Sequence, residues 1–341
     1  MKKLTTKGLL VACCILAIWA TGGSSRVTAA VVSDSPPAAP ARPPAGPPPI
    51  TADASEEEIR NGVAAVRAGR KLTPSNWPNN ARVVVCITVD VDNESLARNR
   101  PLPVPLSNGE YGATTGLPGI LGLLEREQVP ATFFVPAMSP ILHPEIIPAI
   151  QKSGRNEIGM HGWVHESWPD LGGDAAAEEK LINKSIDYLT RVTGKRPVGV
   201  RSPSSALSTN SVALLKKAGF LYDSSLEARD EVYEIDSYGK PSGLIEVPMN
   251  NIMNDFRYYG GDSNGGLMSP ELLFDVYKAE FDMAYEEGSL VTFMLHPHVS
   301  GHRSRVAQVR KFIEYMKAKP GVWFTTMHEV ASYAKEHGAV K

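Results

Sequence analysis

Short apolar runs alternate with amphipathic stretches from Arg82 almost to the end of the chain. The apolar runs are rich in β-branched and aromatic residues, which favours strands, and the stretches between them have the period of helices that bury one face. Such alternation predicts an α/β fold of parallel strands wrapped by helices, in which about seven units close a distorted barrel, with an open doubly wound sheet as the alternative. The expected strands are residues 82–89, 131–135, 157–160, 198–201, 244–248, 290–295 and 322–326, and the expected helices are residues 117–127, 144–152, 175–193, 208–218, 270–287, 305–317 and 327–336.

The first segment, residues 1–30, is typical of a secretory signal peptide. Three lysines precede an apolar run over residues 8–20, and cleavage after Ala29 or Ala30 would follow small residues. The run is shorter than the roughly 20 residues that cross a bilayer, so we expect no membrane span after signal removal. Cys13 lies too early in the run for a lipoprotein box, which makes a lipid anchor the weaker interpretation. The sequence therefore predicts a secreted or periplasmic protein.

Two further segments precede the alternating pattern. Residues 31–50 are proline-rich without a hydrophobic period, which indicates an extended linker. Residues 51–80 are expected to form an N-terminal extension of one or two short helices, capped by Ser55 and ended near Pro74. The folded catalytic domain is expected over residues 81–335.

Composition excludes some functions and suggests no partner. The chain has 37 acidic and 35 basic residues among its 341, so it has no basic surface of the kind that binds nucleic acid. No glycine-rich loop follows the first expected strand, which argues against a nucleotide-binding sheet.

Polar side chains gather just past the carboxyl ends of the expected strands. In parallel α/β folds this rim is where active sites assemble, because the strand ends converge there and the loops can vary. The residues at these positions are Asp90, Asp92, His161, His165, Arg201, His296 and His298.

A metal site is predicted from two of these motifs. His161 and His165 lie four residues apart in HGWVH, a spacing that can direct both rings at one ion, and Asp92 supplies a carboxylate. Three ligands leave a coordination position open, which is typical of catalytic rather than structural zinc. Asp90 is then available as the base, and a solvated turn after the strand, with Asp92 and Asn93 as turn formers, is the alternative.

The remaining polar residues suggest an acid, a steering residue and a substrate groove. Amide hydrolysis needs an acid for the leaving nitrogen, and His296 at a strand end suits that role. Arg201 at a strand end requires a carboxylate partner, for which Asp90 is the candidate. Other residues have a functional and a plain packing interpretation: Trp163, Tyr111 and Arg303 as substrate contacts, His298 and His302 as loop residues, Glu94 as a supporting or surface acid, and His143, His328 and His337 as surface residues.

Seven motifs in order resemble the polysaccharide deacetylase superfamily. They are DVDNES, GEYG, ATFFVPA, HGWVHES, GVRSP, EVPM and LHPHVSGHRSR, and they span about residues 81–333. The nearest branch resembles peptidoglycan deacetylase-like proteins and also includes cyclic imide hydrolases and metal-free allantoinases. The resemblance implies a distorted (β/α)7 barrel and an acetate leaving group from an N-acetylated sugar.

The resemblance also implies roles that agree with those expected from the residues. Asp90 would be the base, steered by Arg201, and His296 the acid. The ligands Asp92, His161 and His165 would bind a divalent metal, usually Zn²⁺. Where relatives usually carry an aromatic and an acid, this chain has Ser205 and Ala206, and Asn250 and Asn251 replace a bulkier ring, which changes the substrate wall.

Three functions follow as hypotheses. The first is metal-dependent N-deacetylation of a cell-wall or extracellular glycan, such as peptidoglycan or an N-acetylglucosamine polymer. The second is an imidase or allantoinase-like hydrolase of small cyclic amides, which a signal peptide disfavours. The third is an inactive glycan-binding module, which loss of a metal ligand would have supported, although none is lost.

Overall fold

The computed structural model describes residues 50–99, 101–259 and 268–338. These residues belong to one compact unit that covers residues 42–341. The expected signal peptide and all but the last residue of the expected linker lie outside the described residues. Within the described ranges, none of the helices combines the length and apolar character needed to cross a bilayer.

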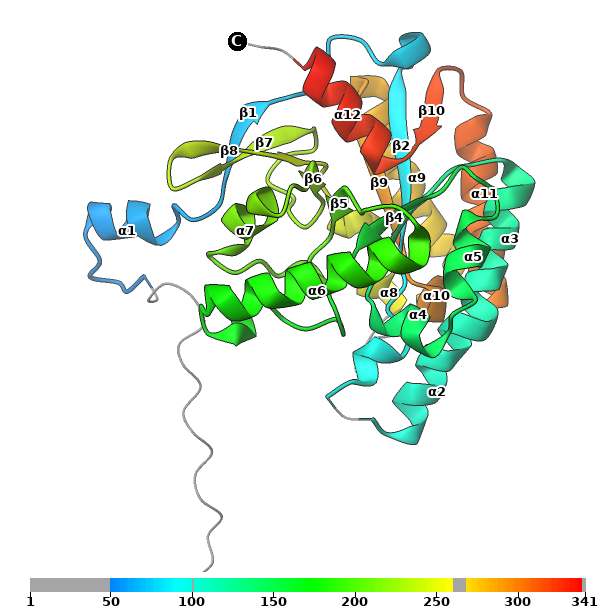
Figure 1. The fold of residues 1–341 in the computed structure, drawn as a ribbon. Coiled ribbons are helices and arrows are strands. Elements are labelled where there is room, and N and C mark those ends of the chain that lie inside the picture. The colour runs from blue at the N-terminus through cyan, green and yellow to red at the C-terminus, as the bar shows by residue number, and fades with distance from the viewer. Residues whose placement is uncertain (1–49, 100, 260–267, 339–341) are drawn as a thin grey trace, which may run out of the picture. The chain divides into compact units, whose positions relative to one another are not determined.

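A curled sheet of mostly parallel strands forms the centre of the molecule (Figure 1). Strand β2 is buried along its whole length and pairs in parallel with β3, β9 and β10. Burial on both faces explains why its sequence, VVVCITVD, is an almost continuous apolar run. The parallel strands are β2 (Val83–Asp90), β3 (Thr132–Val135), β4 (Glu157–Met160), β5 (Gly199–Val200), β6 (Tyr222–Asp223), β8 (Lys240–Glu246), β9 (Leu290–Leu295) and β10 (Val322–Thr325).

The barrel is distorted because β8 and β9 do not pair along their length. The contacts on this side include a parallel bridge between Asn254 and Met294 and a hydrogen bond from Thr292 Oγ1 to the Pro248 carbonyl. The prediction of a distorted α/β barrel is confirmed, as a curled sheet that is open at one seam.

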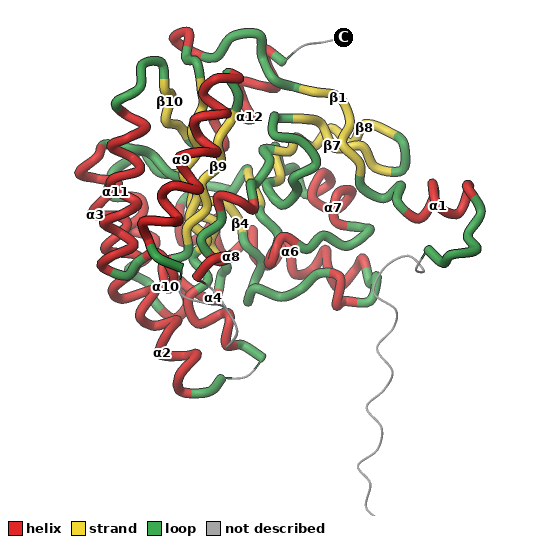
Figure 2. Tube along the Cα trace, turned by 180° about the vertical axis from the view of Figure 1, so that it is seen from behind, coloured by secondary structure: helices red, strands yellow, loops and turns green. Residues whose placement is uncertain are grey.

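Helices cover the outside of the curled sheet (Figure 2). The long helices α3, α6 and α9 have the bounds that their apolar periodicity predicts, and Asp174 and Ser269 cap the starts of α6 and α9. The helices are α1 (Glu56–Gly62), α2 (Pro103–Tyr111), α3 (Leu117–Glu127), α4 (Met138–Leu142), α5 (Ile146–Gln151), α6 (Ala175–Thr193), α7 (Ser211–Lys217), α8 (Phe256–Tyr259), α9 (Pro270–Glu287), α10 (Pro297–Ser300), α11 (Arg303–Lys317) and α12 (Met327–His337).

An antiparallel edge extends the parallel sheet. Strand β7 (Tyr233–Ser237) forms a hairpin with β8, and β1 (Arg67–Lys71) adds to β7. The prediction of only helices across the N-terminal extension is therefore wrong after Gly62. Periodicity missed β1 because an edge strand with charged residues buries little apolar surface.

One helical segment links the two loops that carry the candidate site. It continues from α2 through a π-helical turn (Gly112–Gly116) into α3, and it packs on both Asn93 and α10. A Cβ at Gly116 would lie 2.1 Å from the Pro297 carbonyl oxygen, so only glycine permits this approach. The GEYG motif, residues 109–112, lies at the start of this close-packed segment, which holds the loop after β9 against the loop after β2.

Candidate active site

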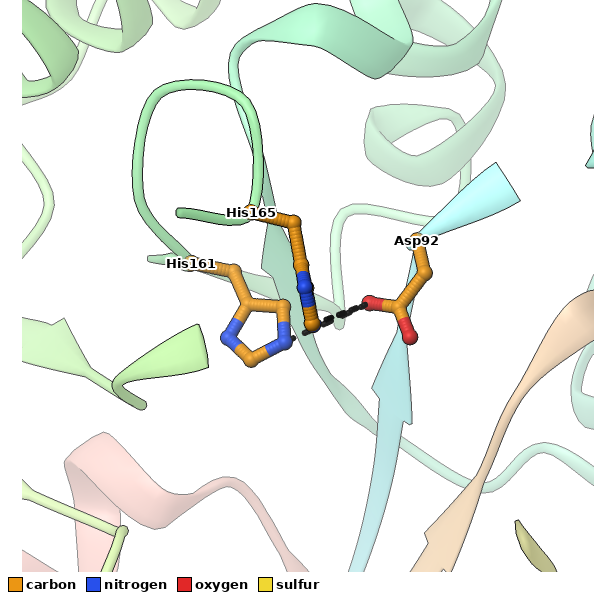
Figure 3. A group of neighbouring side chains, drawn as sticks. All are labelled: Asp92, His161 and His165. Carbon is orange, nitrogen blue, oxygen red and sulfur yellow. Dashed lines mark ion pairs between the residues drawn. The ribbon is translucent and has the colours of Figure 1, made fainter. Parts of the chain in front are cut away.

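Asp92, His161 and His165 converge at the carboxyl edge of the sheet, and all three are buried (Figure 3). Oδ1 of Asp92 lies 3.3 Å from Nε2 of His161 and 3.7 Å from Nε2 of His165. One donor atom from each residue lies within 4.8 Å of the others. The structure therefore brings together the three residues that the sequence suggested as metal ligands.

Local hydrogen bonds fix the two imidazoles. Nδ1 of His161 lies 2.8 Å from the Arg201 carbonyl, which can only accept, so Nδ1 carries the proton and Nε2 is left free to bind an ion. His165 has a left-handed backbone, with φ of 59°. The Glu166 carboxylate accepts hydrogen bonds from the backbone N–H groups of Trp163 and Val164, which holds the HGWVH turn together.

The donor set fits a divalent cation. Among the described residues, Oδ1 of Asp92 accepts no hydrogen bond although it is buried, and a buried carboxylate oxygen without a partner is costly. Burial raises the pKa of Asp92, but His165 and His161 lower it by more, so the carboxyl group is ionised. Burial lowers the pKa of His165 to about 4, which keeps that ring neutral, as a metal ligand must be.

Asp90 and Arg201 form a buried ion pair beside this triad. Nη1 of Arg201 lies 2.7 Å from Oδ1 of Asp90, which is the contact that the sequence predicted. The guanidinium also donates to Thr88 Oγ1 and to the carbonyl and hydroxyl oxygens of Ser224, so its orientation is fixed. Oδ2 of Asp90 is left facing His161 and His296, at 3.8 and 3.9 Å from their Nε2 atoms.

His296 has a carboxylate partner that the sequence analysis missed. Asp255 is fully buried, and its two oxygens accept hydrogen bonds from Nδ1 of His296, at 2.6 Å, and from the His296 backbone N–H, at 2.9 Å. Burial lowers the pKa of His296, but Asp255, with Asp92 and Asp90, raises it to about 9. His296 therefore carries a proton at neutral pH. The signal in the sequence was the position of Asp255 as a lone acid in the polar run after EVPM.

A cavity of about 210 Å³ opens onto these groups. Its remaining wall comes from residues that the sequence analysis did not single out, apart from Ser205 and Asn251. In addition to Asp90, Asp92, His161, His165 and His296, the lining consists of Leu96, Ser204, Ser205, Asn251, Asn254, Phe256, Arg257 and Met294.

The three residues suggested as substrate contacts do not line this cavity. Trp163 packs edge-on against Tyr188 and lies under the Lys184 ammonium. Tyr111 stacks on His302, and Arg303 is the first residue of α11.

His143 is more buried than expected. Nε2 of His143 lies 2.7 Å from Oε1 of Glu94, and both side chains are at most 15% exposed. The prediction of His143 as a surface residue is wrong, because the turn after β2 packs against α4 and encloses the pair. His298 is partly buried, and burial lowers its pKa to about 4.

Known proteins match the chain over most of the described fold. The sequence profile of the polysaccharide deacetylase family matches residues 108–222. A peptidoglycan deacetylase of Helicobacter pylori is 28% identical over 257 residues, which cover 67% of this chain and 87% of the relative. A peptidoglycan deacetylase-like protein of Gibberella zeae is 28% identical over 73% of this chain and 86% of its own length.

Solved structures also match most of the chain. A Mycobacterium smegmatis protein solved as a polysaccharide deacetylase is 32% identical with a TM-score of 0.72, over 81% of this chain and 99% of that chain. The allantoinase PuuE is 26% identical with a TM-score of 0.69, over 79% and 95% of the two chains. The curled barrel, the matched profile and these relatives agree, and the chain therefore belongs to the polysaccharide deacetylase superfamily, a group of hydrolases that act on C–N bonds.

Proposed function

We propose that this protein is a metal-dependent deacetylase that removes N-acetyl groups from an extracellular or cell-wall glycan. The observation that carries the proposal is the buried group of Asp92, His161 and His165, in which Oδ1 of Asp92 has no hydrogen-bond partner among the described residues. Two pairs flank this group: Asp90 with Arg201, which can accept a proton, and His296 with Asp255, which can donate one. The similarity to peptidoglycan deacetylases supports the glycan.

The ion would be held by Asp92, His161 and His165, and Zn²⁺ suits two imidazoles and a carboxylate. When bound, it would polarise the acetyl carbonyl and make water a stronger nucleophile. No other residue is needed as a ligand.

The flanking dyads divide the proton transfers between them. Asp90 would accept the proton of the attacking water through Oδ2, while Arg201 holds Oδ1 and fixes the orientation of the carboxylate. His296, protonated and held by Asp255, would donate a proton to the sugar nitrogen as the C–N bond breaks. Acetate and a free amino sugar would then leave.

Acetate release tests this function directly. Purified protein with added zinc should release acetate from N-acetylglucosamine oligomers or peptidoglycan fragments, and chelation should stop the reaction. The similarity to allantoinase PuuE favours a small cyclic amide as the second candidate. Turnover of imides or allantoin without any acetate release would replace the first proposal. Binding of glycans without hydrolysis of either class would instead indicate an inactive module.

We also propose that the protein acts outside the cytoplasm. The support is the signal-like N-terminal sequence and the linker that follows it. N-terminal sequencing of the protein recovered from a periplasmic or culture fraction should begin near Val31. Recovery of the intact chain from the cytosol would contradict this.

A further inference from the structure

One cation lines the cavity without belonging to the catalytic dyads. Arg257, on the short helix α8, is the only lysine or arginine among the described lining residues, and it is exposed. Arg201 is not part of the lining and is already paired with Asp90. Arg257 is thus a cation outside the catalytic dyads that a molecule in the cavity can contact.

The Arg257 side chain is oriented by a chain of hydrogen bonds. Its Nε donates to Oδ1 of Asn251 at 2.9 Å. The backbone N–H of Asn251 donates to Glu227 at 3.1 Å, and its Nδ2 donates to the other oxygen of the same carboxylate. Because the amide nitrogen of Asn251 is committed to Glu227, its oxygen must face Arg257.

This arrangement leaves the binding end of the guanidinium available. Within residues 50–99, 101–259 and 268–338, neither Nη atom makes a hydrogen bond, and no carboxylate forms an ion pair with Arg257. The planar edge of a guanidinium matches the two oxygens of a carboxylate, so the group most suited to this position is a carboxylate.

The shared cavity relates this carboxylate to the reacting amide. Arg257 and His296 both line it, and so does Phe256, whose ring centroid lies 5.3 Å from that of His296. The cavity of about 210 Å³ is smaller than the roughly 300–1,000 Å³ that encloses a drug-sized ligand, so it encloses about one sugar unit, and the rest of a glycan would extend outside it. A group that reaches Arg257 is therefore on the same sugar unit as the amide at His296, or directly attached to it.

We propose that Arg257 binds a carboxylate on the sugar unit whose N-acetyl group is removed. An N-acetylated acidic sugar such as N-acetylmuramic acid, with its lactyl carboxylate on the ring carbon next to the acetamido carbon, is then preferred over neutral N-acetylglucosamine. The inference rests on the proposed deacetylation and specifies its substrate class.

The test compares one saccharide in two charge states. The probes are an N-acetylglucosaminyl-N-acetylmuramic acid disaccharide with a free lactyl carboxylate and its neutral methylamide. Acetate release and calorimetric binding are measured for the wild type, Arg257→Gln, Arg257→Lys and Asn251→Ala. Arg310→Gln, an exposed arginine on α11 that does not line the cavity, is the matched control.

We expect the wild type to favour the acid over the methylamide by about tenfold in kcat/KM, the size of one charged hydrogen-bonded contact. Arg257→Gln should abolish this preference, mainly through a higher KM for the acid, with a clearly smaller change for the methylamide. Arg257→Lys should keep part of the preference, Asn251→Ala should reduce it, and Arg310→Gln should leave it intact.

Two results would overturn the proposal: equal losses on both probes in Arg257→Gln, which indicate a structural role, or no loss on either. If the wild type releases no acetate from any glycan, the proposed deacetylation fails. In that case tighter binding of the acid that disappears in Arg257→Gln still supports carboxylate recognition, whereas equal binding of both probes refutes it.

Discussion

At the amino-terminal edge of the parallel sheet, the partly buried carboxylate of Glu157 accepts hydrogen bonds from Thr132 Oγ1, the Tyr222 hydroxyl and the His328 backbone N–H, at 2.7–2.9 Å. At the carboxyl edge, Oδ1 of Asp92 is buried and, among the described residues, accepts none. The protein itself supplies the hydrogen-bond donors to Glu157, and this contact links α12 to the sheet. Oδ1 of Asp92 can obtain a partner only from a bound ion or molecule.

The difference arises from the direction of the strands. At the amino-terminal edge the start of helix α12 offers N–H groups that suit a carboxylate. At the carboxyl edge the strands are followed by loops, and those loops bring imidazole nitrogens instead of N–H donors to Asp92. A buried acid is therefore evidence of a binding site only when its oxygens lack donors.

The largest effect is expected from Asp92→Ala. This change removes one of three candidate ligands, and loss of the several kcal/mol that a metal ion contributes should lower acetate release by at least about 10³-fold. Metal content, measured by mass spectrometry of the dialysed protein, should fall in parallel. Thermal stability of the metal-free protein should not fall, since the change also removes a buried carboxylate. Undiminished turnover would refute the assigned ligand.

Asp255→Asn should follow, with a loss of about 10²-fold, the lower range for a general acid. Asp255 holds the pKa of His296 at about 9 against burial. Without this charge His296 loses its proton at a lower pH, so the alkaline limb of the kcat profile should move to lower pH. Asp275→Asn on the exposed face of α9 is the control. A uniform loss with no movement of the limb would mean that Asp255 only supports the loop.

Glu157→Ala should give the opposite pattern to Asp92→Ala. It leaves the Thr132, Tyr222 and His328 donors buried or partly buried without their acceptor, and each such group costs about 1–3 kcal/mol. The free energy of unfolding, from urea titration, should drop by about 3 kcal/mol or more, while metal content of the folded protein stays the same. Loss of metal at unchanged stability would remove the distinction between the two edges.

The smallest effect is expected at a third group of buried acids. Glu246 lies against Asp223 at the ends of β8 and β6, and burial followed by the charge of Asp223 raises its pKa well above the ordinary value. Because the folded state then holds a proton that the unfolded state releases, stability is greatest at low pH and decreases as pH rises above the unfolded pKa near 4.5.

Glu246→Gln should remove that decrease. Unfolding midpoints in urea at pH 5 and pH 8 should differ less in this variant than in the wild type, and Glu287→Gln, at an exposed position, should behave as the wild type. If both variants and the wild type share one pH dependence, the pair does not hold the extra proton.

Much of the fold was predictable because it depends on local periodicity. The apolar stripe of a helix such as α6 or α9 and the continuous apolar run of β2 are properties of a few adjacent turns or residues, and each predicts its own burial. The residues Asp90, Asp92, His161 and Arg201 could be placed at one edge because parallel strands bring their carboxyl ends together.

The sequence by itself determined the alternating architecture, the candidate metal ligands and the pairing of Asp90 with Arg201, since strand order and charge sufficed for these. Only the tertiary structure decided the open seam, the β1–β7–β8 edge and the wall of the cavity. Asp255 binds His296, which lies 41 residues later in the sequence, and Asn251 orients Arg257 at the cavity by a hydrogen bond. These contacts depend on how separate loops pack against each other, and no periodicity within a single segment records that.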